Sequence, residues 1–210
     1  MPGLFITFEG VEGAGKSTQA ALLCEALKRS GLRVRALREP GGTSVGESIR
    51  ALLLSQKDPV TLHAELLLFS AARAQLVETI IRPRLLAGEI VICDRYIDST
   101  IAYQGYARGN DLDLVTKMNE FATAGLKPDV TFLLDLDPTV GLGRQNERNR
   151  MEAEGLAFHE RVRHGFLSIA QAEPDRVVVL DASRPAVQLQ DSVLNQISTR
   201  LPAGTFPKSV

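Results

Sequence analysis

The sequence predicts an α/β fold, a doubly wound five-stranded parallel sheet flanked by helices. Three observations predict it. Five short apolar runs alternate with longer segments of helical periodicity. These runs are continuous rather than alternating, as is typical of parallel strands buried on both faces. A polar or glycine-rich stretch follows each run, and ligands bind such sheets beyond the carboxyl ends of the strands.

The elements follow one another in β-α order, which indicates right-handed crossovers. Strands are expected at Leu4–Phe8, Val34–Leu37, Ile90–Cys93, Val130–Leu134 and Val177–Leu180. Helical patterns occupy Lys16–Ser30, Leu62–Leu86, Asp113–Ala124, Pro138–Arg148, Phe158–Gln171 and Pro185–Ile197. Gly31 suits the C-terminal cap of the first helix. Pro83 is expected to bend the long second helix.

Length and composition favour a globular cytoplasmic protein. The 210 residues suit one domain, residues 1–210, with room for a substrate-binding insert. A formal net charge of −1 argues against a large basic surface, so neither nucleic acid nor a membrane is an expected partner. The start of the chain lacks the charged region of a signal peptide, and no apolar run is long enough to span a bilayer. Cys24 and Cys93 are interpreted as free thiols in a reducing compartment.

A glycine-rich turn separates the first predicted strand from the first predicted helix. Gly10-Val11-Glu12-Gly13-Ala14-Gly15-Lys16-Ser17 matches the phosphate-binding motif G-x-x-x-x-G-K-[ST] in full, and Thr18 follows it. Backbone N–H groups and the helix N-terminus would hold phosphate oxygens. Lys16 would reach the β- and γ-phosphates, and Ser17 would ligate Mg²⁺. The alternative, a chance glycine turn, does not explain the flanking strand and helix.

Glu12 is the unusual residue of this loop. A carboxylate is repelled by phosphates unless it binds a cation or sugar hydroxyls. We therefore expect it to serve the acceptor nucleotide or the metal. The alternative is a solvent-facing loop carboxylate.

A second acidic element ends the predicted strand Ile90–Cys93. Asp94 at the end of a strand opposite the glycine loop suits the Walker B role of holding Mg²⁺, and Arg95 can bridge donor and acceptor phosphates. A phosphomonoester is mostly dianionic at neutral pH, so it needs no strong general base. Asp94 is therefore expected to orient metal and arginine. The alternative for this pair is a structural ion pair.

Four blocks together resemble the bacterial thymidylate kinase family. They are Phe8-Glu9-Gly10-Val11-Glu12-Gly13-Ala14-Gly15-Lys16-Ser17-Thr18, Arg38-Glu39-Pro40-Gly41-Gly42-Thr43, Asp94-Arg95-Tyr96 and Ser99-Thr100-Ile101-Ala102-Tyr103-Gln104-Gly105. The resemblance implies the P-loop NTPase fold with a short mobile lid. It also implies transfer of the ATP γ-phosphate to dTMP, with Mg²⁺, for dTTP biosynthesis. A homodimer is implied as well.

The same resemblance implies an acceptor-binding region at residues 38–75. Within it, Arg38 and Pro40 would help hold the acceptor, with Arg38 facing its phosphate. Phe69 and Arg73 lie four apart on one helix face, where they would stack on thymine and donate to its carbonyl. The alternative for Phe69 is core packing. Further substrate contacts are implied at Ser99, Thr100, Tyr103 and Gln104, with Tyr103 excluding a ribose 2′-hydroxyl.

Some members of this family carry an arginine at the loop position that is Gly13 here. The resemblance therefore implies that another arginine neutralises the transferring phosphoryl group. Residues 143–155 resemble the lid that closes over ATP. Arg150 best matches the lid arginine that reaches the phosphates, and Arg144 would lie against the adenine. The alternative is a solvated charged helix face.

Two other readings remain open on the residues alone. One is a P-loop kinase for a different monophosphate or for a deoxynucleoside. The other is a nucleotide-dependent switch, although the chain lacks the Asn-Lys-x-Asp motif that reads guanine. ADP release measured with a panel of monophosphates separates these readings.

Overall fold

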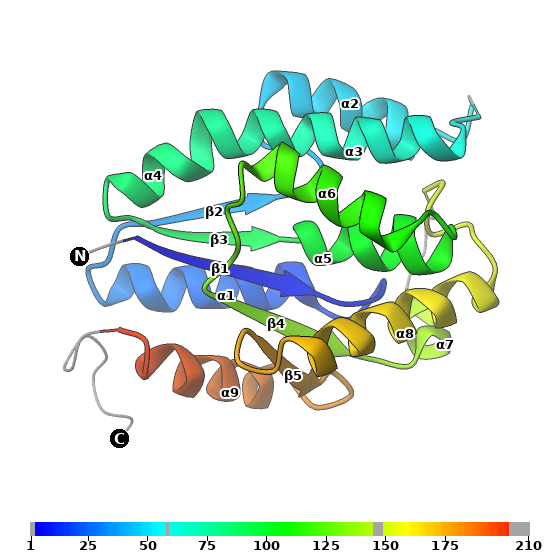
Figure 1. The fold of residues 1–210 in the computed structure, drawn as a ribbon. Coiled ribbons are helices and arrows are strands. Elements are labelled where there is room, and N and C mark those ends of the chain that lie inside the picture. The colour runs from blue at the N-terminus through cyan, green and yellow to red at the C-terminus, as the bar shows by residue number, and fades with distance from the viewer. Residues whose placement is uncertain (1–2, 58, 145–148, 202–210) are drawn as a thin grey trace.

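The computed structural model describes residues 3–57, 59–144 and 149–201 (Figure 1). Its strands form one parallel sheet in the order β2-β3-β1-β4-β5, which confirms the predicted fold class. The strands are β1 (Leu4–Glu9), β2 (Val34–Arg38), β3 (Ile90–Asp94), β4 (Val130–Asp135) and β5 (Val177–Asp181). Each begins where the apolar run predicts and ends one residue later, on a charged side chain. Parallel backbone pairing therefore continues to the sheet edge, as in the register Arg38↔Asp94.

The expectation that all five strands are buried on both faces is wrong for β2 and β5. These two strands carry exposed positions along their length, whereas β1, β3 and β4 are almost entirely buried. The reason is topological, because β2 and β5 form the two edges of the sheet.

The helices cover the sheet and one another as Figure 1 shows. They are α1 (Lys16–Arg29), α2 (Ser44–Leu54), α3 (Leu62–Leu76), α4 (Arg82–Leu86), α5 (Ile97–Thr100), α6 (Leu112–Thr123), α7 (Pro138–Gly143), α8 (Leu156–Ala172) and α9 (Ala186–Ser198). α1 packs against β1, β2, β3 and α9, whereas α8 contacts β4 and β5. α2 lies on the outside against α3.

Two helical segments differ from expectation. The pattern Leu62–Leu86 is interrupted by the π-helix η1 (Val77–Ile81) rather than at Pro83, which sits in the first turn of α4, where a missing N–H is tolerated. A second π-helix, η2 (Ile101–Ala107), continues from α5. Part of the predicted helix Pro138–Arg148 lies outside the described residues.

α2 was not predicted, although the sequence contains its signal. Ser44-x-x-Glu47 fits a helix-start pattern, and in the structure Thr43 caps the helix by accepting from the Gly46 N–H (2.9 Å). Because Gly41 and Gly42 favour a turn, this region was interpreted as a loop, and the helix after it was not predicted.

The buried side chains along β1 alternate between two hydrophobic clusters. Ile6 and Phe8 belong to one buried cluster, while Phe5 belongs to another that contains Tyr96 and Leu76. This period of two places the β1 side chains on opposite faces of the sheet. Within the described residues, no helix is both long and apolar enough to cross a membrane.

Candidate active site

A cavity of about 450 Å³ opens at the carboxyl ends of β1, β2 and β3. Because these strands are neighbours in the sheet, loops far apart in sequence meet at this edge. Most of the predicted site residues line it: Glu12, Gly13, Gly15, Lys16, Ser17, Thr18, Arg38, Pro40, Phe69, Arg73, Asp94, Arg95, Ser99, Thr100, Tyr103, Gln104 and Arg144. Gly10, Val11 and Ala14 belong to the same loop but are buried and do not line the cavity.

The glycine loop turns from β1 into α1 through left-handed backbone. Gly13 has φ 69°, and a Cβ there would lie 2.3 Å from the Gly141 carbonyl oxygen, so no larger residue fits. α1 begins at Lys16, whose Nζ donates to the Val11 carbonyl (2.8 Å). Burial and the nearby Arg95 guanidinium lower the pKa of Lys16 to about 8. A phosphate group arriving at the loop would favour the charged form of this amine and raise its pKa again.

Asp94 and Ser17 meet beside the loop. β3 pairs with β1 in the register Phe8↔Asp94, which brings the end of β3 next to the start of the loop. Ser17 Oγ donates to Asp94 Oδ2. A hydroxyl and a carboxylate are the hard oxygen donors that Mg²⁺ takes from nucleotide-binding proteins, with phosphate and water completing its shell. The part of the chain that the structure describes holds no cluster of three or more His, Cys, Asp or Glu side chains that would favour another metal.

Arg95 lines the cavity and is held from several sides. Its backbone has φ 71°, in the left-handed region. Its Nη2 donates to Glu12 Oε1 (2.7 Å) and the Tyr103 hydroxyl (3.2 Å). Its Nη1 donates to the Gly10 carbonyl (3.1 Å) and Ser99 Oγ (3.2 Å). The guanidinium is therefore oriented before any substrate is bound.

Glu12 is the counter-charge of this arginine. Burial alone would raise the pKa of Glu12, but Arg95 and Lys16 lower it to about 2. The Tyr103 hydroxyl also donates to Glu12 Oε1 (3.0 Å). Glu12 is thus an ionised, largely buried carboxylate, which rules out the solvent-facing alternative.

Phe69 and Arg73 lie one turn apart on α3 and line the same cavity. Arg73 is only 1% exposed. Its nitrogens donate to Glu39 Oε2 (2.8 Å), Thr100 Oγ1 (2.7 Å), Asn119 Oδ1 (2.7 Å) and the Tyr96 carbonyl (2.9 Å). Burial raises the pKa of Glu39, and the attraction of Arg73 opposes that rise. Arg73 is therefore fixed by protein groups, and a base carbonyl would have to share one of its hydrogens.

Comparison with known proteins identifies this arrangement. The family model for thymidylate kinase matches residues 8–193. Thymidylate kinase from Solidesulfovibrio magneticus is 52% identical over 191 residues, which cover 86% of this chain and 91% of that protein. The relative from Deinococcus radiodurans is 48% identical over 201 residues, covering 94% and 98%. The crystal structure of thymidylate kinase from Ehrlichia chaffeensis matches with a TM-score of 0.78 at 38% identity, covering 94% of this chain and 99% of that one.

The chain belongs to the thymidylate kinase family. It is an ATP-dependent phosphotransferase that converts dTMP to dTDP. The predicted family resemblance, fold class and reaction are thereby confirmed.

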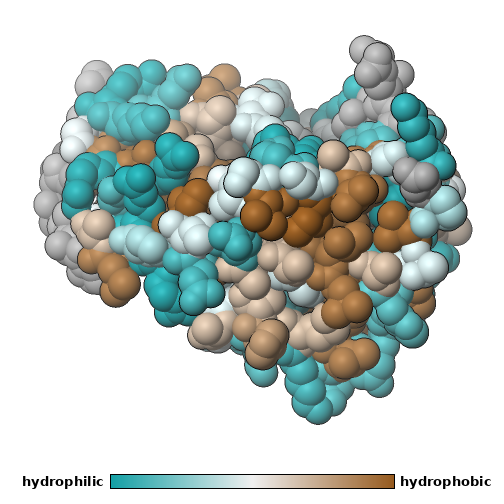
Figure 2. All heavy atoms as spheres, turned by 90° about the horizontal axis from the view of Figure 1, so that it is seen from above, coloured by the Kyte–Doolittle hydropathy of each residue, from teal (hydrophilic) through white to brown (hydrophobic). Residues whose placement is uncertain are grey.

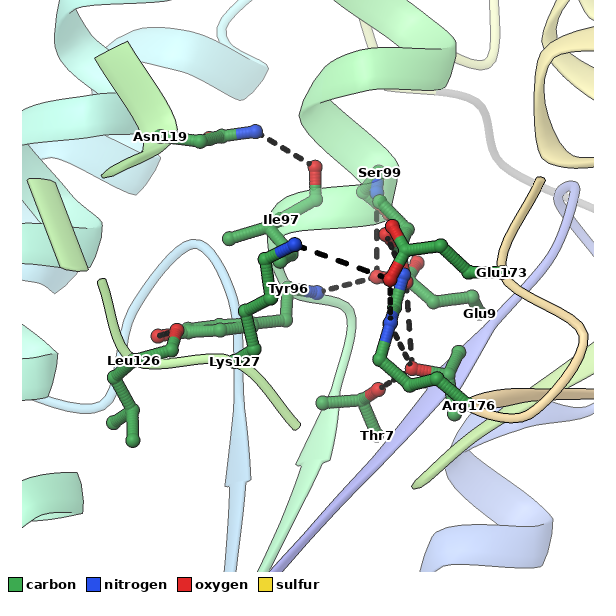
Figure 3. A network of polar contacts seen from close by, with 12 residues as sticks. Thr7, Glu9, Tyr96, Ile97, Ser99, Asn119, Leu126, Lys127, Glu173 and Arg176 are labelled. Carbon is green, nitrogen blue, oxygen red and sulfur yellow. Dashed lines mark hydrogen bonds and ion pairs between the residues drawn. The ribbon is translucent and has the colours of Figure 1, made fainter. Parts of the chain in front are cut away.

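Glu9 is a fully buried carboxylate that was not singled out from the sequence. It ends β1, and its Oε1 accepts from the N–H groups of Tyr96 (2.7 Å) and Ser99 (3.2 Å) (Figure 3). Its Oε2 accepts from the Ser99 hydroxyl (2.6 Å). Burial and the nearby Asp98 raise the pKa of Glu9 to about 8. Glu9 therefore holds the backbone immediately after Arg95 and the hydroxyl that Arg95 contacts.

The two predicted lid arginines have different surroundings. Arg144 Nη1 donates to the Gly13 carbonyl (2.9 Å) at the edge of the loop. Arg150 points elsewhere: its Nη1 pairs with Glu65 (2.7 Å) and its Nε donates to the Leu53 carbonyl (2.8 Å). The structure does not bring Arg150 to the glycine loop. Residues 145–148 of the predicted lid lie outside the described residues.

Among the residues not predicted as site residues are Arg50 and Glu39, which line the cavity, and Glu65, which does not line it. Arg50 on α2 lines the cavity and donates to the Pro40 carbonyl (2.9 Å). Glu39 pairs with Arg73, and Glu65 pairs with Arg150. Finding α2 from its start signal would have placed Arg50. Glu9 follows a buried strand as Asp94 does, so the signal used for Asp94 would have found it.

Proposed function

We propose that this cavity transfers the γ-phosphate of ATP to dTMP by positioning and charge neutralisation, with no protein group acting as a general base. The phosphate end of the cavity, defined as residues 10–18 with Asp94 and Arg95, would hold the triphosphate and the dTMP phosphate. The observation that carries the proposal is the position of Arg95 between Glu12 and Ser99, in the same cavity as Lys16. Lys16 would contact the β- and γ-phosphates, and Arg95 would bridge donor and acceptor.

We propose Ser17 and Asp94 as the protein ligands of Mg²⁺. Their oxygens already contact each other, so an ion near both would displace the hydroxyl hydrogen bond. When bound, the ion would supply positive charge to the β- and γ-phosphates. Ionised Glu12 would keep Arg95 oriented.

dTMP is proposed to lie toward the base end of the cavity, defined as Phe69, Arg73, Thr100 and Gln104. Phe69 offers a flat apolar face for the pyrimidine ring, and the other three offer polar groups to its edge. Arg38, Pro40 and Ser99 would line the path of the acceptor phosphate and sugar. The ring of Tyr103, which is 5% exposed and fixed by Glu12 and Arg95, would leave no room for a ribose 2′-hydroxyl.

Residues 143–155 are proposed to form a lid over ATP. Arg144 already contacts the loop and would lie beside the adenine. Arg150 would serve the phosphates only if it left Glu65 and Leu53, to which it is bound in this structure.

A homodimer is proposed through the outer helices. Exposed apolar side chains gather on α2, α3 and α6: Val45, Leu52, Leu62, Leu67, Leu112, Leu114 and Phe121. Figure 2, which looks onto the molecule from above, shows a hydrophobic area surrounded by hydrophilic groups. A second copy would bury these side chains, and sedimentation of wild type and Leu67→Glu tests this.

The proposed location is the cytoplasm, where dTDP would be one phosphorylation from dTTP.

The test of the proposed function is ADP release with dTMP, dUMP, dCMP, dGMP, deoxythymidine or no acceptor, with and without Mg²⁺. The proposal expects rapid turnover with dTMP and Mg²⁺ only. Equal slow hydrolysis with every acceptor would support a nucleotide-dependent switch. Turnover with deoxythymidine would require a general base and would contradict the proposed mechanism.

A further inference from the structure

Glu65 on α3 is a buried carboxylate that connects Gln104, at the base end of the cavity, to Arg150 of the proposed lid. It is 1% exposed. Its Oε1 accepts from Gln104 Nε2 (2.9 Å) and Arg108 Nε (3.2 Å). Its Oε2 accepts from Arg108 Nη2 (3.3 Å) and pairs with Arg150 Nη1 (2.7 Å). Two guanidinium groups and one amide therefore surround a single carboxylate.

These partners keep Glu65 ionised. Burial alone would raise its pKa, but the hydrogen bonds from Gln104, Arg108 and Arg150 and the charge of Arg108 lower it. An ionised carboxylate has no hydrogen to donate, so it can only accept.

The ionisation of Glu65 fixes the orientation of the Gln104 amide. Only the amide nitrogen of Gln104 can face a carboxylate that accepts, so its carbonyl oxygen must be at the other end of the carboxamide. The backbone of Gln104 is held as well, since Asn110 Nδ2 donates to its carbonyl (2.6 Å). Gln104 lines the cavity at the base end. The side chain therefore has one preferred orientation before a nucleotide is bound.

We propose that Glu65 is a positioning residue for base specificity: by holding the Gln104 nitrogen, it presents the Gln104 carbonyl oxygen to the pyrimidine edge. An acceptor at this place suits the N3–H of thymine. Cytosine carries a lone pair at N3, so two acceptors would face each other and remain unsatisfied. This inference rests on the proposed function, in which Gln104 contacts the base.

The experiment compares kcat/KM for dTMP with kcat/KM for 5-methyl-dCMP in the full-length enzyme. The two nucleotides share the methyl group, sugar and phosphate and differ only in the N3 and C4 edge. In Glu65→Gln, the residue-65 nitrogen can donate to Gln104 and let its amide turn round. We expect the dTMP preference, the ratio of the two kcat/KM values, to fall about tenfold or more. General loss of stability would lower both values together and leave this ratio unchanged.

Glu154→Gln is the matched control. Glu154 Oε1 pairs with Arg108 Nη1 (2.6 Å), so this change removes a carboxylate from the same arginine without touching Gln104. We expect it to keep the ratio within about twofold. If Glu65→Gln does not fold, Glu65→Asp, whose shorter carboxylate cannot reach Gln104, replaces it with the same expected fall.

Gln104→Leu separates the two levels of the proposal. A fall in the ratio in Gln104→Leu together with an unchanged ratio at position 65 would overturn the positioning role and leave the proposed base contact intact. An unchanged ratio in Gln104→Leu would overturn both. An equal fall of the ratio in Glu154→Gln and in Glu65→Gln would also overturn the positioning role of Glu65, because both changes act on Arg108.

Discussion

At the phosphate end of the cavity, Lys16 and Arg95 lie among the carboxylates Glu12 and Asp94, and the Arg95 side chain is 15% exposed. At the base end, the Arg73 side chain is only 2% exposed and donates to four protein groups. A phosphoryl-transfer site needs cations whose partners can be exchanged for substrate oxygens. A base-reading site needs polar groups that point one way and leave wrong partners unsatisfied. The contrast suggests that charges at the phosphate end act on the reaction, while those at the base end act first on shape and stability.

Lys16→Met tests the reactive side of this contrast and has the largest expected effect. The variant keeps the side-chain stem but removes the charge beside the β- and γ-phosphates. We expect kcat to fall about 1000-fold, with little change in the melting temperature. Steady-state kinetics and thermal unfolding measure the two effects, with the exposed Lys117→Met as the control. A loss of stability with kcat retained would reverse the roles assigned to the two ends.

Arg73→Met tests the structural side. Removing this cation leaves Glu39 buried without its partner, in a place where burial already raises its pKa. We expect a loss of about 3 kcal/mol in the free energy of unfolding, measured in urea. Adding Glu39→Gln should recover part of this loss. If the single variant is as stable as the exposed control Arg29→Met, the claim that Arg73 stabilises the fold is wrong.

Arg95→Lys sharpens the comparison, because lysine keeps the positive charge but lacks the planar guanidinium with its several N–H donors. A lysine cannot contact Glu12, Ser99 and Tyr103 together. We expect kcat to fall about 100-fold with a smaller change in the KM for dTMP, because a guanidinium aligned with the transferring group is lost. Base discrimination between dTMP and 5-methyl-dCMP should persist. A large change in that discrimination would show that the two ends are not separable.

Glu9→Gln gives a smaller effect with a defined pH dependence. The pKa of Glu9 is about 8 in the folded protein, above its ordinary value of 4.5. Between these values the folded protein holds a proton that the unfolded chain has released, so Glu9 costs stability as pH rises through this window. Relative to wild type, Glu9→Gln should gain on the order of 2 kcal/mol between pH 5 and pH 8.

Urea unfolding at several pH values measures this difference, with the exposed Glu25→Gln as the control. A constant difference across the window would mean that Glu9 is ionised throughout in the folded protein.

The sequence predicted the regular parts of this molecule well because they depend on local patterns. Every strand start followed from an apolar run, and the glycine loop followed from a complete motif between strand and helix. The convergence of Ser17 and Asp94 also followed, since parallel strands bring their carboxyl ends together. The exposure of the edge strand β2 could not be predicted, because burial depends on strand order, which local patterns do not contain.

Side-chain partners were the least predictable part. Phe69 and Arg73 were placed correctly on one helix face, but nothing local indicated that Glu39 and Asn119, 34 and 46 residues away in sequence, would occupy the guanidinium. The partner of Arg150 was equally unpredictable, since Glu65 lies on a helix far from the lid in sequence. The predicted contact of Arg150 with the phosphates stays a prediction. Long-range ion pairs depend on the assembled fold.

The central claim is that one cavity holds the ATP phosphates at the glycine loop and the dTMP phosphate at Arg95, facing each other. Calorimetric titration with adenosine and deoxythymidine joined through five phosphates tests it most directly. We predict one molecule bound per chain, at least about 100-fold tighter than ATP or dTMP alone, because the second contact becomes intramolecular. Binding no tighter than ATP, with dTMP still able to bind afterwards, would contradict the account.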